Sequence, residues 1–62
     1  MLSRTEKRNL QRQLTALGFD TKGIDGRIGS DSLRAIRAWQ TANDVIADGY
    51  VEKALYQRIM DP

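Results

Sequence analysis

Leucines near the start of the chain recur with the period of a helix. They stand at i, i+4 and i+7, at Leu10, Leu14 and Leu17, and this spacing places them on one stripe of a helical surface. Ser3 and Glu6 have the spacing of a capping box, in which each side chain accepts a hydrogen bond from the other residue's backbone. The pattern predicts a helix over residues 4–17, with Gly18 ending it and Phe19 folding back as its hydrophobic contact.

Glycines interrupt the stretch that follows, residues 18–29, so it cannot be helical throughout. They are Gly18, Gly23, Gly26 and Gly29. Asp25-Gly26 is a strong turn signal, because the carboxylate accepts nearby amide hydrogens while glycine adopts a positive φ. We expect Ile24 and Ile28 to flank this turn and to pack its inner side against the core, which predicts an ordered loop.

Two further helices are predicted after this loop. The apolar face of the second consists of Leu33, Ala35, Ile36 and Trp39, a spacing that assigns the tryptophan to the core. This helix is expected to begin near Ser30, whose hydroxyl and the neighbouring Asp31 suit a helix N-terminus, and to end around Asn43. An apolar connector, residues 45–47, precedes a third helix over residues 51–60. Its inward positions are Val51, Leu55 and Ile59.

A short internal repeat links two predicted turns. Asp25-Gly26-Arg27-Ile28 and Asp48-Gly49-Tyr50-Val51 resemble each other, and each precedes a helix. We interpret them as one structural device used twice. The predicted fold is therefore all-α, a small three-helix bundle that forms a single domain over residues 1–62. Two tight Asp-Gly turns precede its second and third helices.

The composition excludes several kinds of chemistry. The chain has no cysteine and no histidine, which removes disulfides, the usual zinc ligands and the common nucleophilic triads. Its eight acidic residues stand mostly at predicted caps and turns, whereas a glycosidase needs two carboxylates held across a cleft. We expect a binding domain without metal, cofactor or catalytic residues.

The charge and hydropathy of the chain restrict its surroundings less sharply. The net charge is +2, and residues 1–22 carry five basic against two acidic groups. A basic segment of this kind fits a solvated helix surface or contact with an anionic polymer. No apolar run approaches the roughly 20 residues of a membrane span, and no signal-peptide pattern precedes the domain. The chain is expected to be cytosolic or one module of a longer exported protein.

Several spaced motifs resemble the peptidoglycan-binding domain of the type-1 family. The family pattern runs roughly L-x-x-L-G-[FY], D-G-x-[FIV]-G-P-x-T, A-[IV]-x-x-[FW]-Q and a final D-G before the last helix. The matching motifs here are Leu10-Gln11, Leu17-Gly18-Phe19, Asp25-Gly26-Arg27-Ile28-Gly29, Ala35-Ile36, Trp39-Gln40 and Asp48-Gly49. The resemblance covers about residues 9–60. Ser30 and Ser32 replace the proline and threonine of the pattern, and the usual proline before the second Asp-Gly is absent.

Two further stretches, Leu2-Ser3-Arg4 and Ala47-Asp48-Gly49-Tyr50, look like the C-terminal domain of lytic murein transglycosylases. This resemblance implies a non-catalytic module that targets an attached cell-wall lytic enzyme to the glycan strands or stem peptides of peptidoglycan. It also implies an exported parent in the periplasm or cell envelope of a Gram-negative bacterium. The module itself is expected to be a monomer.

The predicted loops offer groups that peptidoglycan would need. Its sugars are N-acetylated and its stem peptides carry carboxylates, so a binder needs a cation, amide-matching groups and an apolar platform. The candidate ligand-binding residues are Asp25, Gly26, Arg27, Gly29, Gln40, Asn43 and Tyr50, if the two Asp-Gly turns lie together. Arg27 supplies the cation and Tyr50 an exposed ring. For Asp25, Gly26 and Gly29, a purely structural role in the turn is the competing interpretation.

Two other functions stay open at this point. A protein-interaction module that docks on its own parent enzyme fits the same sequence. A small DNA-binding helical domain fits the three short helices and the sequence pI of about 9.4. Against DNA binding, the connectors are longer and richer in glycine than the short turn of a helix-turn-helix, and acidic Asp31 and Asp44 accompany the arginines of the second helix. Nucleic acid is therefore not the expected partner.

Overall fold

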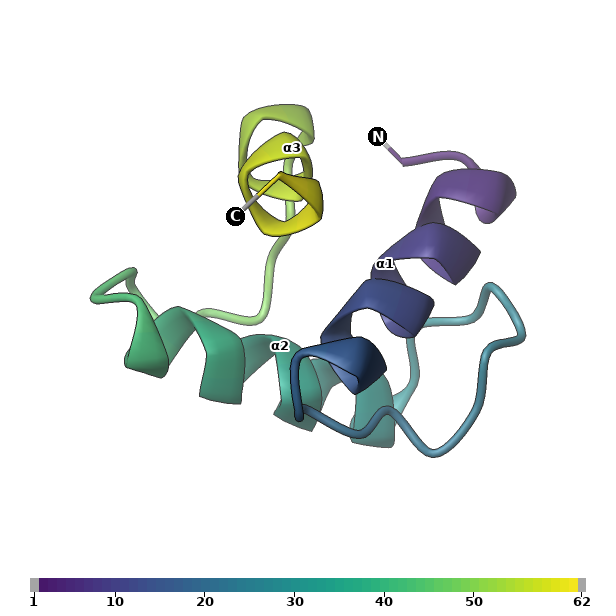
Figure 1. Cartoon of the computed structure of the whole chain (residues 1–62), viewed down its shortest axis with the longest axis horizontal. Helices are drawn as coiled ribbons and strands as arrows, with labels where there is room; N and C mark the ends of the chain where they lie inside the picture. Colours follow the sequence, from purple (N-terminus) through teal and green to yellow (C-terminus); the bar gives the residue numbers. More distant parts are fainter. Residues whose placement is uncertain (1, 62) are drawn as a thin grey trace.

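The computed structural model describes residues 2–61 and consists of helices and loops over that range. The helices are α1 (Arg4–Ala16), α2 (Ser30–Ala42) and α3 (Lys53–Met60). In Figure 1, α2 runs across the bottom of the molecule, α1 rises obliquely beside it, and α3 is seen nearly end-on above. Helix α1 packs against both of the others. The predicted all-α, three-helix fold is confirmed, and the two end residues of the predicted domain lie outside the described range.

The core draws on all three helices and on the segment before α1. Its buried apolar residues are Leu2, Leu10, Leu14, Ala35, Ile36, Trp39 and Ile59. Trp39 is buried, as its spacing predicts, and the Arg58 guanidinium lies over its ring, 5.7 Å from the centroid. Burying one such large side chain contributes about 1.5–3 kcal/mol. A domain with so few of them therefore depends on every one.

Both ends of α1 follow the sequence prediction. The Ser3 backbone N–H donates to Glu6 Oε1 at 2.8 Å, and the Glu6 N–H donates to Ser3 Oγ at 3.1 Å, which completes the capping box. At the other end Gly18 adopts φ 98°, and the Phe19 N–H donates to the Leu14 carbonyl at 2.8 Å. This is the Schellman arrangement, in which a left-handed residue satisfies the last helical carbonyls.

Three predicted details of the loops and helix ends are wrong. Helix α3 begins at Lys53 and not at residue 51, and Glu52 has the extended backbone of an N-cap. Helix α2 is capped by the backbone of Gly29, and no side-chain hydrogen bond caps it, because Ser30 is already its first helical residue. Ile24 leaves 43% of its surface exposed, so only Ile28 of the two flanking isoleucines packs against the core.

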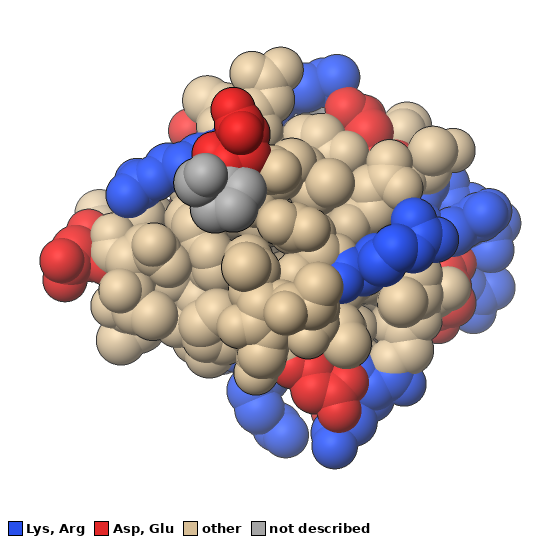
Figure 2. Space-filling view, viewed as in Figure 1, with Lys and Arg blue, Asp and Glu red and all other residues tan. Residues whose placement is uncertain are grey.

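Charged side chains surround an uncharged area on one face of the molecule. Figure 2 shows lysine and arginine most densely on the side that α1 and the following loop occupy in Figure 1. This agrees with the basic first third of the sequence. Over residues 2–61, no helix has the length and apolarity that crossing a bilayer requires.

Candidate functional site

The first Asp-Gly turn is held by a buried glutamine from α1. Gln11 Oε1 accepts a hydrogen bond from the Gly26 N–H at 2.9 Å. Its Nε2 donates to the Arg27 carbonyl at 2.8 Å and to Asp25 Oδ1 at 3.2 Å. The same Asp25 oxygen accepts from the Arg27 N–H at 2.9 Å. One side chain therefore fixes three consecutive residues of the loop onto α1.

The second Asp-Gly turn is held in the same way by α2. Gln40 Oε1 accepts from the Gly49 N–H at 2.9 Å, and its Nε2 donates to Asp48 Oδ1 and to the Tyr50 carbonyl, both at 3.1 Å. The Tyr50 N–H donates to Asp48 Oδ1 at 2.9 Å. The prediction of one structural device used twice is confirmed. We call each set of contacts a glutamine lock, the first centred on Gln11 and the second on Gln40.

The locks also explain the electrostatics of their aspartates. The Arg27 N–H, followed by the Gln11 amide, lowers the pKa of Asp25 below its ordinary value. The Tyr50 N–H and the Gln40 amide lower the pKa of Asp48 in the same way. A hydrogen bond donated to a carboxylate favours its charged form. Both aspartates are therefore carboxylates, and the Oδ1 of each accepts hydrogen bonds that hold its own turn.

Glycine is required at the centre of each turn. Gly26 has φ 80° and Gly49 has φ 76°, both in the left-handed region that side chains with a Cβ rarely adopt. A Cβ on Gly26 would lie 2.7 Å from Arg4 Cγ, and one on Gly49 would lie 3.2 Å from Leu33 Cδ2. The predicted positive φ of Gly26 is confirmed, and each turn lies directly under a side chain of the helix that locks it.

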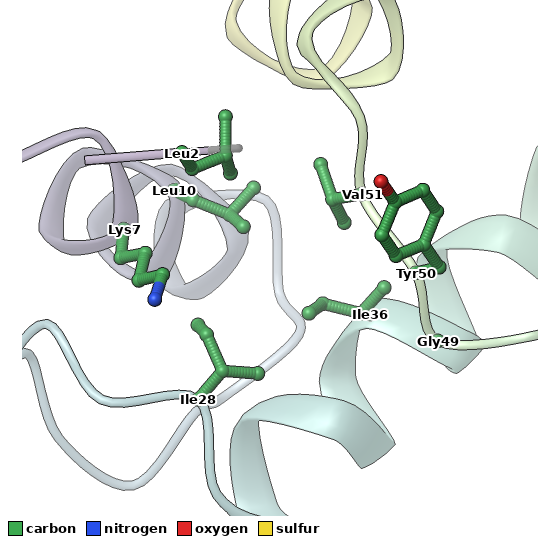
Figure 3. A pocket seen from close by; sticks show the side chains of 8 residues that line it. All are labelled: Leu2, Lys7, Leu10, Ile28, Ile36, Gly49, Tyr50 and Val51. Atoms are coloured by element: carbon green, nitrogen blue, oxygen red, sulfur yellow. The ribbon is translucent and has the colours of Figure 1, made fainter. Parts of the chain in front are cut away.

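A largely apolar cavity of about 230 Å³ lies between the segments that follow the two turns. Its lining residues are Leu2, Lys7, Leu10, Ile28, Ile36, Gly49, Tyr50 and Val51. Figure 3 shows Ile28 on the loop below α1, Val51 and Tyr50 on the segment across from it, and Ile36 of α2 between them. Ile28 and Val51 have the same position in the internal repeat, two residues after Gly26 and Gly49. The two halves of the domain therefore meet at this cavity.

A separate polar hollow of about 320 Å³ lies on the loop at the start of α2. Its lining residues are Gln11, Thr21, Lys22, Gly23, Asp25, Arg27, Gly29, Ser30, Asp31 and Ser32. Lys22 and Arg27 share this hollow with Asp25 and Asp31, so its basic and acidic groups partly compensate one another. A third hollow, of about 350 Å³, lies beside the second turn and is lined by Gln40, Val45, Ile46, Asp48, Tyr50, Glu52 and Leu55.

The seven predicted ligand residues are distributed over these features and do not line one groove. Asp25, Arg27 and Gly29 line the polar hollow, with Gly26 buried in the turn beside it. Tyr50 exposes 66% of its surface between the apolar cavity and the third hollow. Gln40 is buried in its lock. Asn43 is half-buried at the end of α2, where its Nδ2 donates to the Trp39 carbonyl at 2.9 Å.

Gln11 and Lys7 were missed as site residues, whereas Gln40 was among the seven that were predicted. Gln11 directly follows a buried leucine, and Gln40 directly follows the buried Trp39, so the shared position was visible in the sequence. Lys7 stands three residues before Leu10, on the same helical stripe. That spacing already directs the lysine toward the core side of α1, where it lines the apolar cavity.

Known proteins resemble this chain over nearly all of its length. The family model of the peptidoglycan binding domain matches residues 3–59. Two crystal structures of SltB3 from Pseudomonas aeruginosa, in complex with NAG-NAM-pentapeptide and with NAG-anhNAM-pentapeptide, match with a TM-score of 0.91 and 46% identity. Each match covers 95% of this chain and 16% of SltB3, so this chain spans a small part of that protein's length. No curated protein matches the chain.

Proposed function

The chain belongs to the peptidoglycan binding domain family, and we propose that it holds an attached lytic enzyme on the cell wall. The observation that carries this proposal is the family match over residues 3–59, which includes α1, α2, all but the last residue of α3 and both glutamine locks. The domain is a non-catalytic peptidoglycan-binding module. Binding through a separate module raises the local concentration of an attached enzyme at its substrate.

The proposed contacts with peptidoglycan are the loop residues that the locks position. Arg27 is exposed beside the polar hollow and can pair with a stem-peptide carboxylate. The exposed ring of Tyr50 offers an apolar face for a sugar or peptide. Asp25, Gly26, Gly29, Gln40 and Asn43 complete the proposed site, and the burial of Gln40 and Gly26 supports a positioning role for these two.

We also propose the setting in which the module works. The attached enzyme is a lytic murein transglycosylase or another cell-wall hydrolase of a Gram-negative envelope, and the module is monomeric. The similarity to part of SltB3 from Pseudomonas aeruginosa, a longer chain crystallised with NAG-NAM-pentapeptide, supports this setting. The family match favours peptidoglycan over the two alternatives, a docking module for the parent enzyme and a DNA-binding domain.

A pull-down on purified sacculi tests the proposal. The 62-residue chain is mixed with sacculi, with duplex DNA on beads, and with an isolated transglycosylase catalytic domain on beads. Retention on sacculi alone is the expected result. Passage through the sacculi with retention on DNA or on the catalytic domain would replace the proposed function by the corresponding alternative.

A further inference from the structure

We propose that the apolar cavity between the two turns receives the C-terminal end of a peptide, with its carboxylate on Lys7. This inference rests on the proposed function, because it names the part of peptidoglycan that the module would recognise: a stem peptide with small aliphatic residues and a free carboxyl end. It assigns the contact to a residue outside the seven predicted from the sequence.

The lining of the cavity favours a ligand with both an apolar part and an anionic group. Its walls are aliphatic, from Leu2, Leu10, Ile28, Ile36 and Val51, with the Tyr50 ring at the rim. Lys7 supplies the one charged side chain among the described residues that line it. An occupant that satisfies both features has an apolar body and an anionic group.

Lys7 and Ile36 stand at the same distance before the two lock glutamines, and of the two only Lys7 is charged. Lys7 precedes Gln11 by four residues, and Ile36 precedes Gln40 by four residues, so the two side chains have equivalent places in the two halves. Both line the cavity. One half therefore provides an aliphatic wall where the other provides an ammonium group at the end of an aliphatic stem.

Lys7 also differs from the other two lysines in its partners. Lys22 pairs with Asp20 at 3.6 Å, and Lys53 pairs with Glu6 at 2.8 Å. Over residues 2–61, Lys7 forms no such ion pair, and the described lining of the cavity contains no carboxylate. By contrast, Arg27 lies in a hollow with Asp25 and Asp31. The cavity is thus the place where a ligand carboxylate meets a cation without competing acidic lining.

The size of the cavity limits what enters it. Sites for drug-sized ligands measure about 300–1,000 Å³, and this cavity measures about 230 Å³. It fits one or two short aliphatic side chains better than a sugar ring with its N-acetyl group. A terminal peptide segment combines such side chains with a carboxylate close by.

The experiment measures binding of the 62-residue chain to NAG-NAM-pentapeptide and to its C-terminal amide by calorimetry. Wild type should bind the free acid about tenfold or more tightly than the amide, because a charge-assisted contact is lost. Lys7→Met keeps the length of the apolar stem and removes the charge, and it should bind both peptides equally. Arg12→Met, at an exposed arginine of α1 that lines none of the three hollows described above, should keep the wild-type preference.

Each result decides between the cavity and its alternatives. Equal binding of acid and amide by wild type overturns the proposal without any variant, so a poorly folded Lys7→Met would not obscure it. If Arg27→Ala and not Lys7→Met abolishes the preference, the polar hollow holds the carboxylate and the proposal is wrong. Retention on sacculi with no acid preference leaves the proposed function standing and removes only this inference, whereas passage through sacculi removes the proposed function.

Discussion

Gln40 of α2 makes with the second Asp-Gly turn the same contacts that Gln11 of α1 makes with the first. Each side-chain oxygen accepts a hydrogen bond from the N–H of the turn glycine at 2.9 Å. Each side-chain amide nitrogen donates to the carboxylate of the aspartate that precedes this glycine and to the backbone carbonyl of the residue that follows it. The equivalence holds although the connector before the first turn is longer than the one before the second. The two locks, and not the loop lengths, therefore define where the turns lie.

Removing a lock should destabilise the whole domain. Gln11→Ala leaves the buried Gly26 N–H and the Arg27 carbonyl without their partner, which should cost about 1–3 kcal/mol. Urea denaturation followed by circular dichroism measures the change. Gln57→Ala, at an exposed position of α3, should stay within about 0.5 kcal/mol of wild type. Equal midpoints for Gln11→Ala and Gln57→Ala would contradict the structural role of the lock.

The turn glycine should tolerate no β-branched residue. Gly26→Val combines a left-handed φ with a Cβ 2.7 Å from Arg4 Cγ, and it should destabilise the domain by more than about 1 kcal/mol. Gly29→Ala is the control, because Gly29 has φ −97° and an added Cβ would meet nothing within 4 Å. Thermal melts of both variants provide the comparison. A Gly26→Val domain that melts like Gly29→Ala would refute the requirement.

The core should be sensitive to the loss of a single large side chain. Leu14 is fully buried, so Leu14→Ala should cost about 2–5 kcal/mol through lost burial and a residual cavity. Leu17→Ala, at a leucine that is 38% exposed, should cost clearly less. Circular dichroism gives both the helical content and the cooperative transition. A strand-rich spectrum, or equal losses for the two variants, would contradict the described core.

Acid should weaken the contact between α1 and α3. Glu6 has its pKa lowered from 4.5 to about 2, first by the Lys53 ammonium at 2.8 Å and then by the Ser3 N–H. The folded state therefore binds the Glu6 proton less readily than the unfolded state, so this contribution is full above pH 4.5 and disappears as the pH falls toward 2. The melting temperature of wild type should fall over this interval, and more steeply than that of Glu6→Gln. If the melting temperatures of wild type and Glu6→Gln fell in parallel with pH, Glu6 would not contribute to the acid sensitivity.

Arg27 should matter for ligand binding more than for folding. The first lock holds this residue by its backbone, so Arg27→Ala should change stability by no more than about 0.5 kcal/mol. Loss of a charge-assisted bond to peptidoglycan should weaken sacculus binding by about 1–3 kcal/mol, and binding should fall as salt rises. Arg12→Ala, on the exposed surface of α1, is the control. Weaker binding by Arg12→Ala alone would move the binding surface to α1.

The sequence predicted the elements whose signals are local. The capping box at Ser3, the Gly18 helix end and the burial of Trp39 depend on spacing along one helix, and all three are confirmed. The start of α3 depends on a distant contact instead. The Gln40 amide donates to the Tyr50 carbonyl, and the segment after it stays extended through Glu52, so helix α3 starts later than propensity suggests.

The candidate site was predictable in its residue types more than in its shape. Arg27 and Tyr50 are both exposed next to an Asp-Gly turn, as expected from the sequence. Their placement in different hollows was not, because it depends on how α1 and α2 cross and on which buried side chain each turn contacts. The ligand roles of the seven residues stay predictions for the binding measurements described above.

The glutamine locks separate what folds the domain from what it can display. Each lock holds the residue after the Asp-Gly pair through that residue's N–H and carbonyl, and the side chain takes no part in the four hydrogen bonds. The chain already carries two very different side chains at the position after the Asp-Gly pair, the cation of Arg27 and the ring of Tyr50. Substitution there can change the chemistry offered to a ligand while the scaffold remains the same. Evolution or a protein engineer can therefore change the exposed side chain at these two positions without redesigning the fold.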